Sequence, residues 1–88
     1  MSNYKVEFKQ SAVKEAKKLS TPVWDRIKEQ IIDLAHNLIS INSKPLKGFK
    51  GYYRVRIVDY RVVYSIDNEE NKVVIVKIGH RKDIYRDF

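Results

Sequence analysis

The chain has 88 residues, with 18 lysines and arginines against 11 aspartates and glutamates, a formal net charge of +7, and no cysteine. A chain of this length forms one domain, which we expect to span residues 1–88, and the lack of cysteine excludes disulfides and thiolate metal sites. No apolar run has the length of a membrane span or of the apolar region of a signal peptide, so we expect a soluble protein of the cytoplasm.

The N-terminal half is predicted to form one strand and two helices. Apolar and charged residues alternate from Tyr4 to Phe8, which indicates a strand. Ser11 is a candidate N-cap for a short helix, and Thr21 followed by Pro22 marks the start of a longer one. Apolar side chains recur at helical spacing in this second helix, which therefore offers an apolar layer to a sheet: Val23, Trp24, Ile27, Ile31, Leu34, Ala35, Leu38 and Ile41.

The middle of the chain is predicted to form a tight hairpin. Residues 53–57 alternate between apolar and basic side chains, which indicates a half-buried strand. Residues 60–66 are rich in β-branched and aromatic side chains, which favours a second strand. Only Val58 and Asp59 separate the two segments, and this spacing is typical of a two-residue hairpin turn.

In this hairpin register Arg56 faces Arg61, and Arg54 shares their face of the sheet. Like charges opposed across a ladder are destabilising, so a face that gathers three guanidinium groups is predicted to bind an anion. Residues 44–61 contain six basic side chains and one acidic one, and thus carry +5 of the net charge of +7. A basic stripe of this kind indicates a polyanionic partner, usually nucleic acid. The alternative is a lysine-rich surface that only keeps the protein soluble.

The last regular element is a strand over residues 72–78. Four consecutive apolar residues, Val73 to Val76, predict that it is buried on both faces, and Gly79 ends it. The order of elements is then βααβββ. It predicts an α+β domain in which an antiparallel sheet carries both N-terminal helices on one face.

Metal and cofactor chemistry has little support in the sequence. His36 and His80 are far apart, and neither a metal-binding motif nor a phosphate-binding glycine loop is present, so we expect no metal and no cofactor. His36 is interpreted as an ordinary, partly exposed helix residue. His80 directly follows a predicted buried strand and precedes Arg81, which makes it a candidate site residue.

Four segments of the chain form a recognisable set: Leu-Lys-Gly at 46–48, Tyr-Arg-Val-Arg-Ile at 53–57, Tyr-Arg-Val-Val-Tyr at 60–64, and Ile-Gly-His-Arg-Lys-Asp-Ile-Tyr at 78–85. Together they resemble the RelE/ParE toxin superfamily on its RelE side, and the resemblance extends over the whole chain. It implies a microbial-ribonuclease-like fold and the toxin of a type II toxin–antitoxin system. Such a toxin is an mRNA interferase: it cleaves mRNA in the ribosomal A site, inhibits translation and arrests growth until a cognate acidic, RelB-like antitoxin binds it in a heteromeric complex.

The resemblance also implies which residues act. It matches Arg56, Arg61, Arg81 and Tyr85 to the catalytic set, and we assign Arg61 and Arg81 to the scissile phosphate. His80 is added to this set from its own chemistry, because histidine is the residue type that transfers protons near neutral pH. Arg54 is expected to contact the RNA backbone, and the basic stripe of residues 44–61 adds Lys47 and Lys50 to these contacts. The reaction is attack of a ribose 2′-hydroxyl on the adjacent phosphate, which needs no metal, and its general base is left unassigned.

Two other functions remain open at this stage. A ParE-type toxin would use the same fold to inhibit DNA gyrase and would cleave nothing. A non-catalytic RNA-binding module would use the same basic sheet without turnover.

Overall fold

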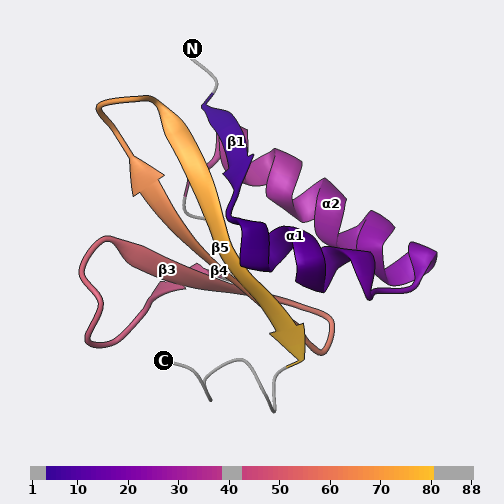
Figure 1. Cartoon of the computed structure of the whole chain (residues 1–88). Coiled ribbons are helices and arrows are strands. Elements are labelled where there is room, and N and C mark those ends of the chain that lie inside the picture. The colour runs from indigo at the N-terminus through magenta and orange to yellow at the C-terminus, as the bar shows by residue number, and fades with distance from the viewer. Residues whose placement is uncertain (1–3, 39–42, 81–88) are drawn as a thin grey trace.

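The computed structural model describes residues 4–38 and 43–80, in which two helices lie on one face of a five-stranded sheet (Figure 1). The elements in chain order are β1 (Lys5–Phe8), α1 (Gln10–Lys17), α2 (Thr21–His36), β2 (Ser43–Pro45), β3 (Tyr52–Ile57), β4 (Tyr60–Asp67) and β5 (Lys72–His80). The predicted α+β class and the placement of both helices on one face are confirmed.

The sheet is mixed, which corrects the prediction of an antiparallel one. The strand order is β1-β5-β4-β3-β2, and β2 to β5 are antiparallel neighbours. Strand β1 runs parallel to β5, with Val6 beside Val73. No hairpin joins these two strands, so nothing local fixes their relative direction, and period-2 alternation carries no information about it. Strand β2 was absent from the predicted order because three residues are too few to show a period.

Helix α1 covers the edge of β5 beyond the end of β1. The Ser11 hydroxyl donates to the Val76 carbonyl at 3.2 Å, and the Glu15 carboxylate accepts the Ile78 N–H at 2.9 Å. The prediction that Ser11 caps the helix is therefore wrong, because Lys9 holds the N-cap position. The side chains of α1 instead pair with backbone groups of β5 that have no strand neighbour there.

Helix α2 supplies the apolar layer that its sequence predicts. It begins after Ser20, one residue earlier than expected for a cap at Thr21, with a proline in the first turn. It ends at His36, whereas its predicted apolar stripe continued to Ile41, which lies outside the described residues. Its buried side chains pack in one core with those of the sheet: Ile27, Ile31 and Leu34 with Val55, Ile57, Val62, Tyr64, Val73, Ile75 and Ile78.

The face of the sheet away from the helices, called here the outer face, is only partly covered. In β5, Val73 and Ile75 are buried under the helices, but Val74 and Val76 are partly exposed. The prediction that β5 is buried on both faces is therefore wrong. No helix in residues 4–38 and 43–80 is both long and apolar enough to cross a membrane.

Candidate functional site

The hairpin of β3 and β4 places the three arginines as predicted. Arg56 lies opposite Arg61, and Arg54 lies opposite Val63. The intervening residues of β3 and β4 point into the helix-covered core, so Arg54, Arg56 and Arg61 share the outer face. We call these three residues the arginine face.

The hairpin turn holds Arg56 in place. Val58 adopts a positive φ of 58°, which is an uncommon conformation for a β-branched residue. Its carbonyl accepts a hydrogen bond from Arg56 Nε at 3.2 Å. One nitrogen of an exposed guanidinium is thus fixed to the backbone, which limits the rotamers that the charge can explore.

Arg61 is the most unusual member of the arginine face. Its side chain is partly buried, and Nη1 is shielded from solvent without a hydrogen-bond partner in the described part of the chain. Leaving a buried charged donor unpaired costs more than a neutral one, which itself costs about 1–3 kcal/mol. Such a donor next to a second arginine is suited to an external acceptor that carries negative charge.

The basic surface continues from the arginine face onto β2 and the loop after it. Lys44 in β2 lies opposite Arg54 in the ladder, so it adds a fourth cation to the outer face. Lys47 and Lys50 are exposed in the loop between β2 and β3. Four of the basic residues of the segment 44–61 therefore share the outer face, and the other two lie in the loop that joins β2 to β3.

His80 is separated from the arginine face. It lies opposite Tyr60 in the β4–β5 ladder, and its ring meets the Tyr60 ring edge-on at 5.6 Å. Tyr60 packs against the helix-covered core, so His80 is on the opposite face of the sheet from Arg61. Arg81 and Tyr85, the remaining predicted catalytic residues, lie outside the described residues.

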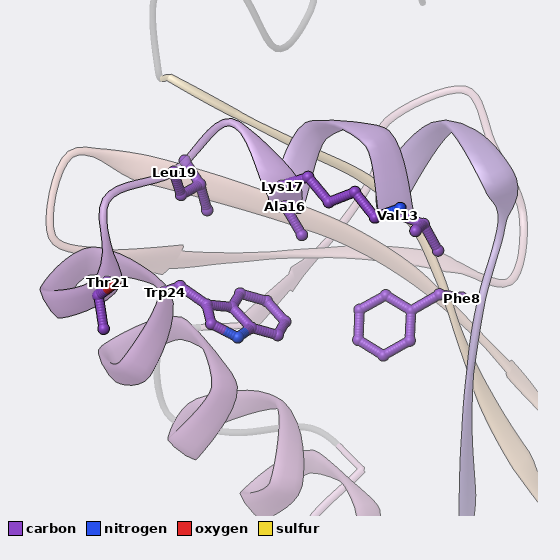
Figure 2. Close-up of a pocket in the computed structure, with 7 residues that line it drawn as sticks. All are labelled: Phe8, Val13, Ala16, Lys17, Leu19, Thr21 and Trp24. Carbon is purple, nitrogen blue, oxygen red and sulfur yellow. The ribbon is translucent and has the colours of Figure 1, made fainter.

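An apolar groove on the helical side was not anticipated from the sequence. Its volume is about 410 Å³, and Val13 and Leu19 from the α1 region and Trp24 of α2 line it together with Phe8 at the end of β1. Figure 2 shows these side chains around the groove. The Phe8 and Trp24 rings meet edge to face, with their centroids 6.2 Å apart. The sequence predicts the apolar stripe of α2 only as a layer that packs on the sheet. In the structure the groove is marked by Val13, a large apolar residue of α1 that is 37% exposed.

Tyr64 ties the sheet to the chain that follows α2. Its hydroxyl donates to the Leu38 carbonyl at 2.9 Å and lies 2.8 Å from Ser43 Oγ, from which it can accept. Burial raises the pKa of Tyr64, and the Ser43 hydrogen bond offsets part of this effect. These contacts fix the start of β2, and β2 in turn carries Lys44 to the outer face.

Known proteins match this chain along most of its length. The family described as ParE toxin of type II toxin–antitoxin system, parDE, matches residues 6–85. Toxin RelE3 of Methanocaldococcus jannaschii is 33% identical over 86 residues, which cover 92% of this chain and 94% of that protein.

A second relative and a solved structure extend the comparison. The mRNA interferase toxin RelE of Escherichia coli is 26% identical over 81 residues, which cover 90% of this chain and 84% of the relative. A chain in the crystal structure of the toxin–antitoxin complex RelBE2 from Mycobacterium tuberculosis superimposes with a TM-score of 0.80 at 30% identity. The superposition covers 91% of this chain and 100% of that one.

Proposed function

The chain belongs to the RelE/ParE family of toxins of type II toxin–antitoxin systems, and from this premise we propose that it is a RelE-type endoribonuclease that cleaves mRNA in the ribosomal A site. The relative from Escherichia coli that carries the name mRNA interferase supports this choice of substrate. The proposed activity inhibits translation in the cytoplasm and needs no metal ion.

The observation that carries the proposal is Nη1 of Arg61, which is buried beside Arg56 and has no hydrogen-bond partner among residues 4–38 and 43–80. Two guanidinium groups opposed across a ladder repel one another, and the repulsion is relieved when a phosphate lies between them. A guanidinium fork matches two phosphate oxygens at once. We therefore assign Arg61 to the scissile phosphate and Arg56 to the same or the adjacent phosphate.

The proposed reaction has one bond formed and one broken. The ribose 2′-hydroxyl attacks the adjacent phosphorus and loses its proton, while the bond to the 5′-oxygen breaks and that oxygen gains a proton. The products are a 2′,3′-cyclic phosphate and a 5′-hydroxyl. Negative charge gathers on the phosphate oxygens in the transition state, and fixed cationic donors stabilise it more than they stabilise the ground state.

The proton transfers are assigned away from His80, because its ring packs on Tyr60 on the face opposite the arginines. We place Arg81 with Arg61 at the phosphate, and Tyr85 against a base or in a proton transfer. Arg54 and the two loop lysines, Lys47 and Lys50, hold the RNA backbone.

The partner proposed for this toxin is an acidic, RelB-like antitoxin, in line with the toxin–antitoxin complex from Mycobacterium tuberculosis. The groove between α1 and α2 is an apolar binding site, into which an amphipathic segment can insert its apolar side chains. Acidic residues of the same antitoxin would then reach the basic outer face. Steering by a net charge of +7 makes association fast and dependent on salt.

Inhibition of DNA gyrase is the second candidate, because the matched family is described by the name ParE. Such a toxin binds its target without cleaving RNA, so it has no need for a buried unpaired donor in a row of arginines. The experiment below separates the two candidates.

Arg61→Ala tests the proposed function. We expect growth arrest to be lost and cleavage of a translated message to fall by about 100-fold to 1,000-fold, as when one transition-state donor is removed. The fold should persist, because the change removes a like-charge pair across the ladder. Lys28→Ala is the matched control, since this lysine is exposed on α2 and its ion pair with Asp25 is long, at 3.8 Å. Folded Arg61→Ala protein that cleaves like the wild type would refute the assignment.

A further inference from the structure

The loop between β2 and β3 consists of two consecutive β-turns. The Phe49 N–H donates to the Leu46 carbonyl at 3.1 Å, and the Tyr52 N–H donates to the Phe49 carbonyl at 3.2 Å. Gly48 at φ 84° and Gly51 at φ 82° each hold the third position of a turn, where the type II conformation requires a positive φ. The Leu46 N–H closes the loop by donating to the Tyr52 carbonyl at 2.8 Å.

The two turns repeat the pattern lysine, glycine, aromatic residue. Lys47 and Lys50 hold the second position of each turn, and both side chains are exposed. Around Gly48 and Gly51 an added Cβ would meet no atom within 4 Å, so the glycines are required by the backbone conformation and not by lack of space. The chain therefore maintains two left-handed positions in order to present this loop in one shape.

The aromatic side chains of the loop differ in exposure. Phe49 is 41% exposed, and its ring meets the Tyr52 ring edge-on at 6.5 Å. Tyr52 packs against a small apolar cluster on the outer face that contains the buried residues Leu46 and Val63. Tyr52 is thus anchored in the sheet, and it supports a phenylalanine ring that remains accessible to solvent.

This loop continues the arginine face. Tyr52, Arg54 and Arg56 alternate along β3, so they point to the same face at intervals of about 6.8 Å, twice the rise per residue of a strand. A shallow hollow of about 470 Å³ lies at the loop, lined in part by Phe49, Lys50 and Tyr52. A strand of RNA that follows the arginines therefore reaches an aromatic ring flanked by two lysines.

We propose that the tandem-turn loop is a single-stranded RNA subsite in which Phe49 stacks on one base and Lys47 and Lys50 bind the flanking phosphates. The inference rests on RNA being the substrate, as proposed above, and adds a residue that determines where the strand sits relative to Arg61. Single-stranded nucleic acid is held by this combination of aromatic stacking and cationic contacts to the backbone. An acidic protein segment would pair with the lysines, but it would not explain why the Phe49 ring is exposed and held in place by Tyr52.

The test is the affinity of the purified protein for a fluorescent, single-stranded 2′-O-methyl RNA, which lacks the attacking hydroxyl and cannot be cleaved. For Phe49→Ala we expect the affinity to fall by about 5-fold to 100-fold with an unchanged salt dependence, since stacking releases no counterions. Lys50→Ala should instead reduce the slope of log K against log salt by about 0.7. Phe49→Trp should bind like the wild type, and Ile32→Ala, at another exposed apolar residue, should have no effect.

A strand of abasic nucleotides provides the internal control, because it offers phosphates without bases. Wild type and Phe49→Ala should bind it equally. Equal affinity of the two proteins for the base-containing RNA would overturn the inference, and so would absence of any RNA binding by the wild type. A loss for Phe49→Ala that persists on the abasic strand, or that affects only antitoxin binding, would likewise overturn it.

Failure of the subsite and failure of the proposed function give different results. If the wild type cleaves mRNA and Phe49→Ala cleaves it with the same KM, the subsite is refuted while the function stands. If the wild type cleaves nothing but binds RNA through Phe49, the subsite stands and the function is refuted. Thermal unfolding of Phe49→Ala and Phe49→Trp shows that both variants are folded before either comparison is made.

Discussion

Tyr64→Phe removes a single oxygen atom and should measure how much the hydrogen bonds between the sheet and the chain after α2 contribute to the free energy of unfolding. The ring of Tyr64 is fully buried and stacks on Tyr53 with centroids 5.7 Å apart, and phenylalanine keeps this packing. The change deletes only the hydroxyl, which bonds the Leu38 carbonyl at 2.9 Å and Ser43 Oγ at 2.8 Å.

The magnitude follows from these two hydrogen bonds. Each contributes about 0.5–1.5 kcal/mol, so their loss should lower the free energy of unfolding by about 1–3 kcal/mol. Ser43 has a further interaction in the structure, which favours the lower half of this range. In a domain of this size each kcal/mol lowers the midpoint of thermal unfolding by about 4–8 °C.

Urea unfolding of wild type and Tyr64→Phe, followed by circular dichroism, gives the difference directly. RNA affinity of the folded variant should stay unchanged, because the hydroxyl lies on the helical side of the sheet and the arginines on the other. An unfolding free energy equal to that of the wild type would show that the two hydrogen bonds of the Tyr64 hydroxyl do not stabilise the fold. An intact stability with lost RNA affinity would place the hydroxyl in the site instead.

Alkaline pH offers a second measurement on the same residue. The pKa of Tyr64 in the folded protein is raised above the ordinary value of 10.0, so the unfolded chain ionises first as pH rises. The stabilising contribution of the protonated hydroxyl is present below about pH 10 and is lost as pH rises through the folded pKa. The gap in stability between wild type and Tyr64→Phe should therefore narrow above pH 10.

The remaining predictions concern the core and the edge of β5. Ile31→Asp should unfold the domain, because it buries a charge at a position that is 2% exposed. Ile32→Asp, at a position that is 53% exposed, should still unfold in a cooperative transition. Equal unfolding curves for the two variants would show that the buried face of α2 is misassigned. Glu15→Ala should lower the free energy of unfolding by about 1–3 kcal/mol, since it removes the carboxylate that accepts from the Ile78 N–H and pairs with the Lys77 ammonium. Glu15→Gln should recover part of the loss through its remaining oxygen. Hydrogen exchange at the Ile78 amide checks the second prediction, and unchanged protection in Glu15→Ala would contradict it.

The hairpin and its arginines could be predicted because local chemistry determines them. A two-residue turn after Ile57 permits one register, and this register opposes Arg56 to Arg61 without any knowledge of the rest of the fold. The direction of β1 could not be predicted in the same way. Its partner β5 lies at the far end of the chain, and the pairing depends on how α1 and α2 pack.

The position of His80 shows what a sequence pattern leaves out. Strict alternation from Val73 and Ile75 would place His80 on the outer face with the arginines. The register shift between Val63 and Tyr64 leaves one extra residue in β5, because Tyr64 pairs with Ile75 and Val63 with Lys77. A β-bulge of this kind reverses the alternation beyond it and turns His80 toward the helices.

The two turns of the loop at residues 46–52 could have been predicted from the sequence, although the sequence assigns a role in this loop only to its two lysines. The repeated Lys-Gly pair is the signature of two turns with a glycine at positive φ, and turn chemistry could have identified it. The exposure of Phe49 could not be predicted, since it depends on Tyr52 and Leu46 packing on the outer face.

The most direct test of the central claim is the chemistry of the cut ends in a translated message. Primer extension on mRNA from a translating extract, with and without the purified protein, locates the cleavage, and enzymatic end-labelling identifies the termini. We predict cuts within codons that occupy the A site, each with a 2′,3′-cyclic phosphate upstream and a 5′-hydroxyl downstream, and no such cuts with Arg61→Ala. Intact messages together with inhibited DNA supercoiling by gyrase, or cut ends that carry a 5′-phosphate, would contradict it.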